Sequence, residues 1–250
     1  MAGSSLAFLF MIVMNFLANY LPLNGVTTAE ISDKYYNIFT PAGFTFIIWG
    51  VIYIALALLV IVLAWGVVKN RERPTRIIST IGPYFIVSSV LNGLWIFTWH
   101  YDLIVLSLVV MLALLISLLR LYTSLNRSPL DGGYYLTPFS IYLGWISVAT
   151  IANIATLSVR FNWGKLGLSG EFWLTILLLL ILGVTAYMVL RRNDLVYGFV
   201  ILWALVGITV ARWGEAGGLS YASGVSIVAA ILVFLVLARK QFGSGNLVSD

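Results

Sequence analysis

Residues 42–67 read AGFTFIIWGVIYIALALLVIVLAWGV and contain no charged side chain. A helix needs about 20 apolar residues to cross the hydrocarbon core of a bilayer, so this segment is long enough to span one. The whole chain agrees, because 61% of its 250 residues are hydrophobic and 9% are charged, whereas soluble domains carry about 25% charged residues. We therefore expect an integral membrane protein.

Seven other segments share this apolar character and are separated by charged or helix-breaking residues. Pro74 precedes one of them, and Ser128-Pro129 with Asp131-Gly132-Gly133 precedes another. The pattern predicts an all-α fold, a polytopic bundle of about eight transmembrane helices. The predicted spans cover residues 4–23, 42–67, 77–98, 103–124, 135–158, 171–190, 195–213 and 219–239.

The distribution of cations predicts the orientation of these spans. Ten Lys and Arg residues fall on one side and four on the other, which by the positive-inside rule places both termini in the cytoplasm, beneath an inner (plasma) membrane. The same bias accounts for the net charge of +5, so we expect membrane lipid and no nucleic acid as a partner. The longest connection, residues 25–40, is then external and is expected to act as a lid. The ten cations on the predicted cytoplasmic side are Lys69, Arg71, Arg73, Arg76, Arg120, Arg127, Arg191, Arg192, Arg239 and Lys240. The four on the external side are Lys34, Arg160, Lys165 and Arg212.

Few residues in the chain are suited to catalysis. There is no cysteine and one histidine, so thiolate chemistry and a site with several His ligands are excluded. The nine acidic residues fall in loops, near span ends or at the terminus, which disfavours a proton-coupled pump. His100 is expected at a solvated external turn, beside Asp102. We predict no catalytic residue and no metal site, and we favour a non-enzymatic role while keeping an enzyme as an alternative.

Polar and aromatic residues recur at helical spacing inside four of the spans. A polar side chain is costly in lipid, so these stripes should face the interior of the bundle. A buried indole N–H needs a hydrogen-bond partner, and a buried amide needs several. The pattern indicates an aromatic-lined cavity opening outward, although each residue taken singly fits bridging between helices or space-filling equally well. The stripes are Asn15 and Asn19; Phe46, Trp49 and Tyr53; Ser88, Asn92, Trp95 and Trp99; and Pro138, Tyr142, Trp145, Ala149 and Asn153.

Three of these segments carry short motifs. They are PAGFTFIIWGVIY at residues 41–53, Asn92-Gly-Leu-Trp95, and WISVATIAN at residues 145–153. In this order, on successive predicted helices and after a long first loop, they resemble the TspO/MBR family, the tryptophan-rich sensory and translocator proteins. The resemblance covers about residues 4–160.

The resemblance implies a five-helix core over residues 1–160 that is often dimeric. In that family the core binds porphyrins, sterol-like lipids and other flat hydrophobic ligands beneath the first loop. Residues 161–250, with the last three spans and a short cytoplasmic tail, have no counterpart in the resemblance. The chain departs from the family pattern at Gly43, where an aromatic residue is expected, and at Ile141, where proline is expected. The predicted ligand-binding residues are Trp49, Tyr53, Asn92, Trp95, Tyr142, Trp145, Ala149 and Asn153.

Three functions are compatible with these features. The first is a sensor or carrier for a planar hydrophobic ligand, either a bound tetrapyrrole or a sterol- or isoprenoid-like lipid, with a homodimer as a further expectation. The second is a small-molecule transporter, although no inverted repeat is found. The third, disfavoured by the shortage of acids and bases, is an intramembrane enzyme acting on a lipid or pigment. Trp203 lies deep in its span without a nearby Asn and is expected to pack among the last three helices.

Overall fold

The structure is a computed structural model that describes residues 2–21, 23–37, 39–128, 133–162, 170–213 and 218–243. Within these ranges the chain is helical, and no strand occurs. The prediction of an all-α bundle is therefore confirmed. The chain divides into two compact units, the first formed by residues 1–37 and 46–163 and the second by residues 38–45 and 164–250.

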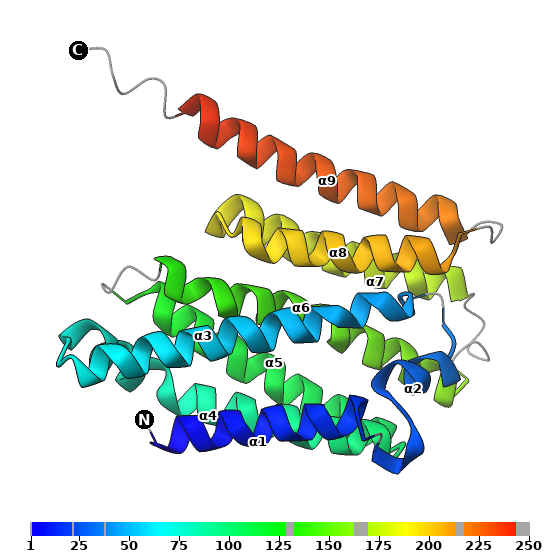
Figure 1. The fold of residues 1–250 in the computed structure, drawn as a ribbon. Coiled ribbons are helices and arrows are strands. Elements are labelled where there is room, and N and C mark those ends of the chain that lie inside the picture. The colour runs from blue at the N-terminus through cyan, green and yellow to red at the C-terminus, as the bar shows by residue number, and fades with distance from the viewer. Residues whose placement is uncertain are drawn as a thin grey trace. The chain divides into compact units, whose positions relative to one another are not determined.

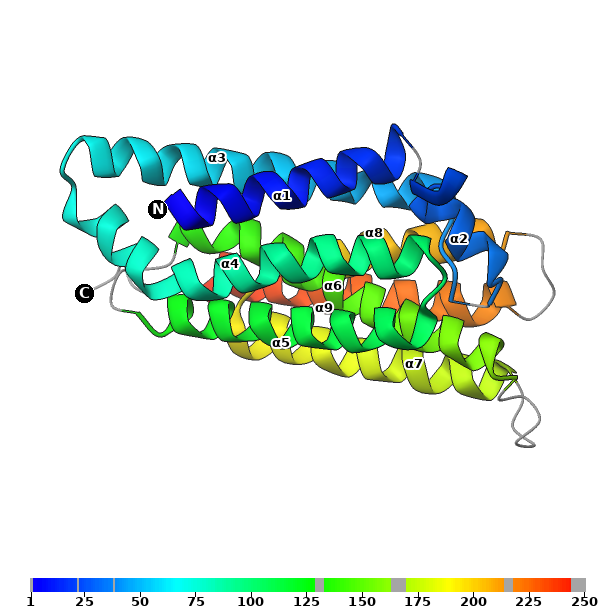
Figure 2. The ribbon, with the colours of Figure 1, turned by 90° about the horizontal axis from the view of Figure 1, so that it is seen from below.

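The first unit contains five long helices that lie side by side and one short helix that lies at their end (Figures 1 and 2). Each of the five is long and apolar enough to cross a membrane. The short helix α2 falls within the segment predicted as an external loop, where Thr27 and Glu30 form a capping box that starts it. The helices are α1 (Ala2–Asn19), α2 (Thr28–Lys34), α3 (Ile48–Val68), α4 (Glu72–His100), α5 (Ile104–Asn126) and α6 (Gly133–Arg160).

The outer face of α3 shows how the bundle meets its surroundings. Ile54, Leu58 and Ile61 follow one another at helical spacing, and each is about 60% exposed. Such a continuous apolar surface would be a liability in water but suits contact with lipid. On the opposite face of the same helix, Ile52 and Leu56 are fully buried. Both faces of α3 are therefore apolar, and one is suited to contact with lipid while the other contacts protein.

Helix α6 is the most buried of the five long helices. Of its most apolar stretch 78% is buried by protein, against 33% for α3. It packs on both α3 and α5, and α4 packs on α1, α3 and α5. A close approach between α1 and α4 depends on Gly93, because a Cβ at that position would overlap the ring of Phe10. These contacts bring Asn15 of α1 and the polar stripes of α3, α4 and α6 to the inside of the unit, whereas Asn19 of the α1 stripe is exposed, contrary to expectation.

The second unit contains three helices that pack on one another, together with the segment that leads from α2 to α3. Asp194 caps the helix that begins at Leu195 by accepting a hydrogen bond of 2.9 Å from the backbone N–H of Tyr197. These helices carry shorter apolar stretches than the first five. They are α7 (Gly170–Ala186), which continues into a π-helical turn (Tyr187–Arg191), α8 (Leu195–Ala211) and α9 (Gly218–Gly243).

Candidate ligand-binding site

Four aromatic rings from three helices contact the indole of Trp49. The ring of Trp49 stacks on Tyr53 and on Trp95, with centroid separations of 5.7 and 5.6 Å. The rings of Tyr142 and Trp145 meet it edge-on, at 6.3 and 6.1 Å. Helices α3, α4 and α6 therefore contribute to one aromatic cluster, which we define as these five residues. All five belong to the set predicted from the sequence.

The stack of rings extends from the aromatic cluster toward α2. Trp95 stacks on Trp99 at 5.9 Å, and the Nε1–H of Trp99 donates a hydrogen bond of 3.2 Å to the carbonyl of Thr28. Trp99 is 3% exposed, so it is a buried residue, although its position at the end of a span would suit an interfacial anchor. A continuous path of aromatic rings thus joins α2 to the first two turns of α3.

A pair of buried amides borders the aromatic cluster. Asn15 on α1 donates a hydrogen bond of 2.7 Å to the Oδ1 of Asn92 on α4, and a second of 2.9 Å to the carbonyl of Met11. The hydroxyls of Tyr53 and Tyr142 lie near the amide of Asn92 without forming a hydrogen bond with it. Asn15 was assigned to a helical stripe from the sequence but not to the site. Its proximity to Asn92 depends on how α1 packs, which residue spacing does not reveal.

Five hydrogen-bonding atoms in this region are buried and have no partner. They are the Nε1 atoms of Trp49, Trp95 and Trp145, the Nδ2 of Asn92 and the hydroxyl of Tyr53. Four of the five are donors only, and the hydroxyl can donate as well. Leaving one buried donor unsatisfied costs about 1–3 kcal/mol. The cluster therefore presents several donors that favour a ligand with acceptor groups.

The last two predicted site residues lie on α6 beyond Trp145. The Oγ of Ser107 on α5 donates a hydrogen bond of 2.8 Å to the Oδ1 of Asn153, whose Nδ2 donates one of 2.9 Å to the carbonyl of Ala149. The amide of Asn153 is thus occupied in bridging α5 and α6. Ala149 is buried on the same helix, one turn after Trp145. These two residues do not add an unpaired donor to the cluster.

Helix α2 is fastened to the turn between α4 and α5. The Nζ of Lys34 lies 2.7 Å from one carboxylate oxygen of Asp102, and the hydroxyl of Tyr35 donates a hydrogen bond of 2.6 Å to the other. At the other side of α2, the Nδ2 of Asn24 donates a hydrogen bond of 3.0 Å to the carbonyl of His100. These contacts, which residue spacing could not reveal, hold the predicted lid over one end of the first unit.

The electrostatics of this attachment follow from its hydrogen bonds. Partial burial works to raise the pKa of Asp102, but the hydrogen bonds from Lys34 and Tyr35 outweigh it and leave that pKa below the ordinary value. The hydrogen bond to Asp102 raises the pKa of Lys34. Burial is the main reason that the pKa of Tyr35 is raised. The carboxylate and the ammonium are therefore each held in the charged form by the other.

The prediction that His100 lies at a solvated turn is wrong. Its side chain is buried, 1% exposed, and its Nδ1 lies 2.7 Å from the carbonyl of Ile96. The chain that follows α1 folds over this turn, as the hydrogen bond from Asn24 shows. Asp102 takes a left-handed backbone conformation, with φ of 61°, so that the chain can reverse between α4 and α5.

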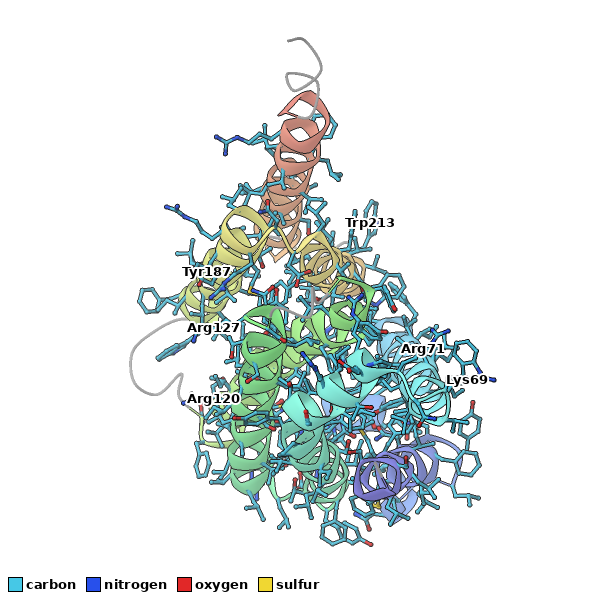
Figure 3. All side chains as sticks on the ribbon, turned by 90° about the vertical axis from the view of Figure 1, so that its left-hand side faces the viewer. Lys69, Arg71, Arg120, Arg127, Tyr187 and Trp213 are labelled. Atoms are coloured by element: carbon cyan, nitrogen blue, oxygen red, sulfur yellow. The ribbon has the colours of Figure 1, made fainter. Side chains whose placement is uncertain are left out.

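Cations gather at the opposite end of the first unit. Lys69 and Arg71 lie where α3 ends, and Arg120 and Arg127 lie on the other side of the same end of the unit, where α5 ends (Figure 3). The guanidinium of Arg71 lies over the ring of Trp65, 4.7 Å from its centroid. Trp65 is 53% exposed, as expected for an indole at a membrane boundary. The cationic end is thus opposite the end of the unit that α2 covers.

Comparison with known proteins gives one match. A family model described as TSPO-like protein matches residues 2–238. The match extends beyond residues 4–160 and takes in α7, α8 and most of α9. No curated protein and no solved structure matches the chain.

Proposed function

This chain belongs to the TSPO-like protein family, and we propose that it binds a planar hydrophobic ligand at the aromatic cluster of α3, α4 and α6. It is a membrane protein of the TspO type, with five helices long and apolar enough to span a bilayer among its described residues. The observation that carries the proposal is the group of buried, unpaired donors on Trp49, Trp95, Trp145 and Asn92.

The chemistry of the cluster defines the ligand class. Aromatic rings favour a flat apolar body, and the indole and amide N–H groups favour acceptor atoms along its edge. A tetrapyrrole meets both conditions, because its ring is flat and its carboxylates accept hydrogen bonds. A sterol- or isoprenoid-like lipid offers the apolar body but fewer acceptors. We therefore rank the tetrapyrrole first.

Binding requires the rings of the cluster to separate. The rings of Trp49 and Trp95 are in contact, and each such pair contributes about 0.5–1.5 kcal/mol. A ligand replaces these contacts with its own stacking and also pairs the free donors. The lid α2, which the indole of Trp99 contacts, lies where the path of rings reaches the end of the bundle. We propose that ligand exchange proceeds under this lid, on the external side of the membrane.

A titration with protoporphyrin IX, followed by its Soret absorption, tests the proposal. Replacing Trp145 with alanine removes an edge-on ring and an unpaired donor, so we expect the dissociation constant to rise at least tenfold. Replacing Trp213, which is 77% exposed, with alanine should leave it unchanged. Unchanged affinity in a folded Trp145→Ala protein contradicts the site. Flux of the porphyrin across proteoliposomes then separates a carrier from a sensor.

A further inference from the structure

Residues 38–45, in the connection between α2 and α3, belong to the second unit, although both helices belong to the first. We call the described part of this segment, residues 39–45, the strap. Its backbone is bonded to α8: the N–H of Ala42 donates a hydrogen bond of 3.0 Å to the carbonyl of Gly207. The strap then continues into α3, which carries Trp49 four residues after Thr45.

Two side chains of the α8 region bind carbonyls of the strap. The Nε1 of Trp203 donates a hydrogen bond of 3.0 Å to Thr45, and the Nη2 of Arg212 donates one of 3.1 Å to Thr40. The ring of Phe44 also meets the indole of Trp203 edge-on, at 5.4 Å. Trp203 therefore holds the strap by a hydrogen bond as well as by packing.

The surface of α8 is shaped for this segment. A Cβ at Gly207 would overlap the side chain of Thr45, so the helix and the strap approach closely only because this residue is glycine. Thr45 is fully buried, and Arg212, the largest of the fully buried side chains, is 1% exposed. A buried guanidinium is costly unless hydrogen-bonded, which supports a specific role for its bond to Thr40.

We propose that α8 anchors the strap and thereby controls the access of ligand to the aromatic cluster, with Trp203, Gly207 and Arg212 as positioning residues. The lid α2 is fixed to Asp102 on one side, and the chain that leaves it is fixed to α8 on the other. When the strap is anchored, the lid can move only within the short stretch between Tyr35 and the strap. The C-terminal helices then set the rate of ligand exchange. This inference rests on the proposed function for its ligand and on the contacts of α8 for its mechanism.

The anchoring is testable without any ligand, because the chain has no cysteine and a single introduced one can carry a nitroxide label. Gly43 in the strap and Gly50 in α3 suit this purpose, since a Cβ at either meets no atom within 4 Å. In a Gly43→Cys protein, Gly207→Ala should raise the mobility of the label. Gly183→Ala in α7, where a Cβ also meets open space, should not. The label at Gly50→Cys should be unaffected by either change. An unchanged spectrum at position 43 in the Gly207→Ala protein overturns the proposal.

The effect on exchange is tested with Trp203→Phe, which keeps a ring beside Phe44 and removes the donor to Thr45. Stopped-flow mixing with protoporphyrin IX should show association and dissociation rates that both rise about fivefold, the factor expected from one net hydrogen bond, with little change in affinity. Trp213→Phe is the matched control. Rates equal to those of the wild type contradict the control of access. If the wild-type protein binds no porphyrin, the proposed function fails, and the label spectra of Gly207→Ala and Trp203→Phe alone decide the anchoring.

Discussion

The side chains of Asn15 and Asn92 form a buried amide pair that links α1 to α4, with an N···O distance of 2.7 Å. Asn15 is 5% exposed and Asn92 is not exposed at all. The bond uses the acceptor of Asn92 and leaves its Nδ2 as an unpaired donor beside the aromatic cluster. The pair thus fixes the orientation of the Asn92 amide, which turns its donor rather than its acceptor toward the aromatic cluster.

Replacing Asn15 with leucine should destabilise the protein and weaken ligand binding. The change leaves the Oδ1 of Asn92 unpaired, which we expect to lower the free energy of unfolding in mild detergent by about 1 kcal/mol, since hydrogen bonds between membrane helices average about 0.6 and reach about 1.7 kcal/mol. Asn19→Leu is the control, because Asn19 bonds only to the backbone of its own helix. Equal losses in the two variants would show that the amide pair has no special role.

Removing the indole donors should affect ligands according to their acceptors. With Trp95→Phe and Trp145→Phe, the rings remain but both unpaired N–H groups are lost. A hydrogen bond to a charged group contributes about 1.5–3 kcal/mol, so each change should weaken protoporphyrin IX about tenfold in a Soret titration. A porphyrin without carboxylates should be affected far less. Trp65→Phe, at the exposed end of α3, serves as the control. Equal loss for both porphyrins would argue against pairing of the donors with acceptors.

The attachment of the lid should depend on pH at both extremes. The pKa of Asp102 is lowered by its partners, so its contribution to the closed lid is present above the ordinary aspartate pKa and is lost as pH falls through the lowered value. The pKa of Lys34 is raised, so its contribution is present below the ordinary lysine pKa and is lost as pH rises through the raised value. The protection factors of the last turn of α2, which correct hydrogen exchange for the pH dependence of the intrinsic rate, should accordingly be highest in the intermediate range.

An Asp102→Asn protein checks the same attachment at constant pH. The variant removes the ion pair with Lys34 and should speed hydrogen exchange in the last turn of α2 near neutral pH. Asp33→Asn, at an exposed position of the same helix, should not. The last turn is the right place to measure, because Glu30 titrates at the first turn, where its hydrogen bonds to Thr27 lower its pKa. Exchange that is insensitive to Asp102→Asn would mean that the ion pair does not hold the lid.

Asn153 should differ from Asn92 in what its replacement affects. Its amide bridges Ser107 and Ala149, so Asn153→Leu should lower the free energy of unfolding, by about 1 kcal/mol, and leave the affinity for protoporphyrin IX within about twofold. Asn92→Leu removes an unpaired donor from the cluster and should weaken binding about fivefold. A large loss of affinity in Asn153→Leu would contradict this prediction and indicate that Asn153 contacts the ligand.

The convergence of Trp49, Trp95 and Trp145 could be predicted because two simple rules act together. Helical spacing assigns each residue to a face, and the cost of polar groups in lipid turns that face inward. The helix α2 also had a local signal, Thr27-x-x-Glu30, which matches a capping box. None of these local signals predicts contacts between residues that are distant in the sequence.

The contacts that could not be predicted from the sequence are between such distant residues. Lys34 and Asp102 are 68 residues apart, and Trp203 and Thr45 are 158 apart. Their meeting depends on how whole helices pack and on a segment that leaves its neighbours for another unit. The burial of His100 has the same origin, since it depends on where the chain after α1 folds. Local polarity at a turn does not show what covers it.

The burial of α6 by protein has a consequence for the biogenesis of the chain. With protein rather than lipid around most of its length, this helix tolerates Tyr142, Asn153 and other polar residues, and its best stretch is less hydrophobic than that of α3 or α5. Partition from the translocon into lipid depends on the hydrophobicity of each segment. We therefore expect α3 and α5 to insert into the bilayer independently. Helix α6 should remain in the bilayer only when α3 and α5, on which it packs, have already inserted.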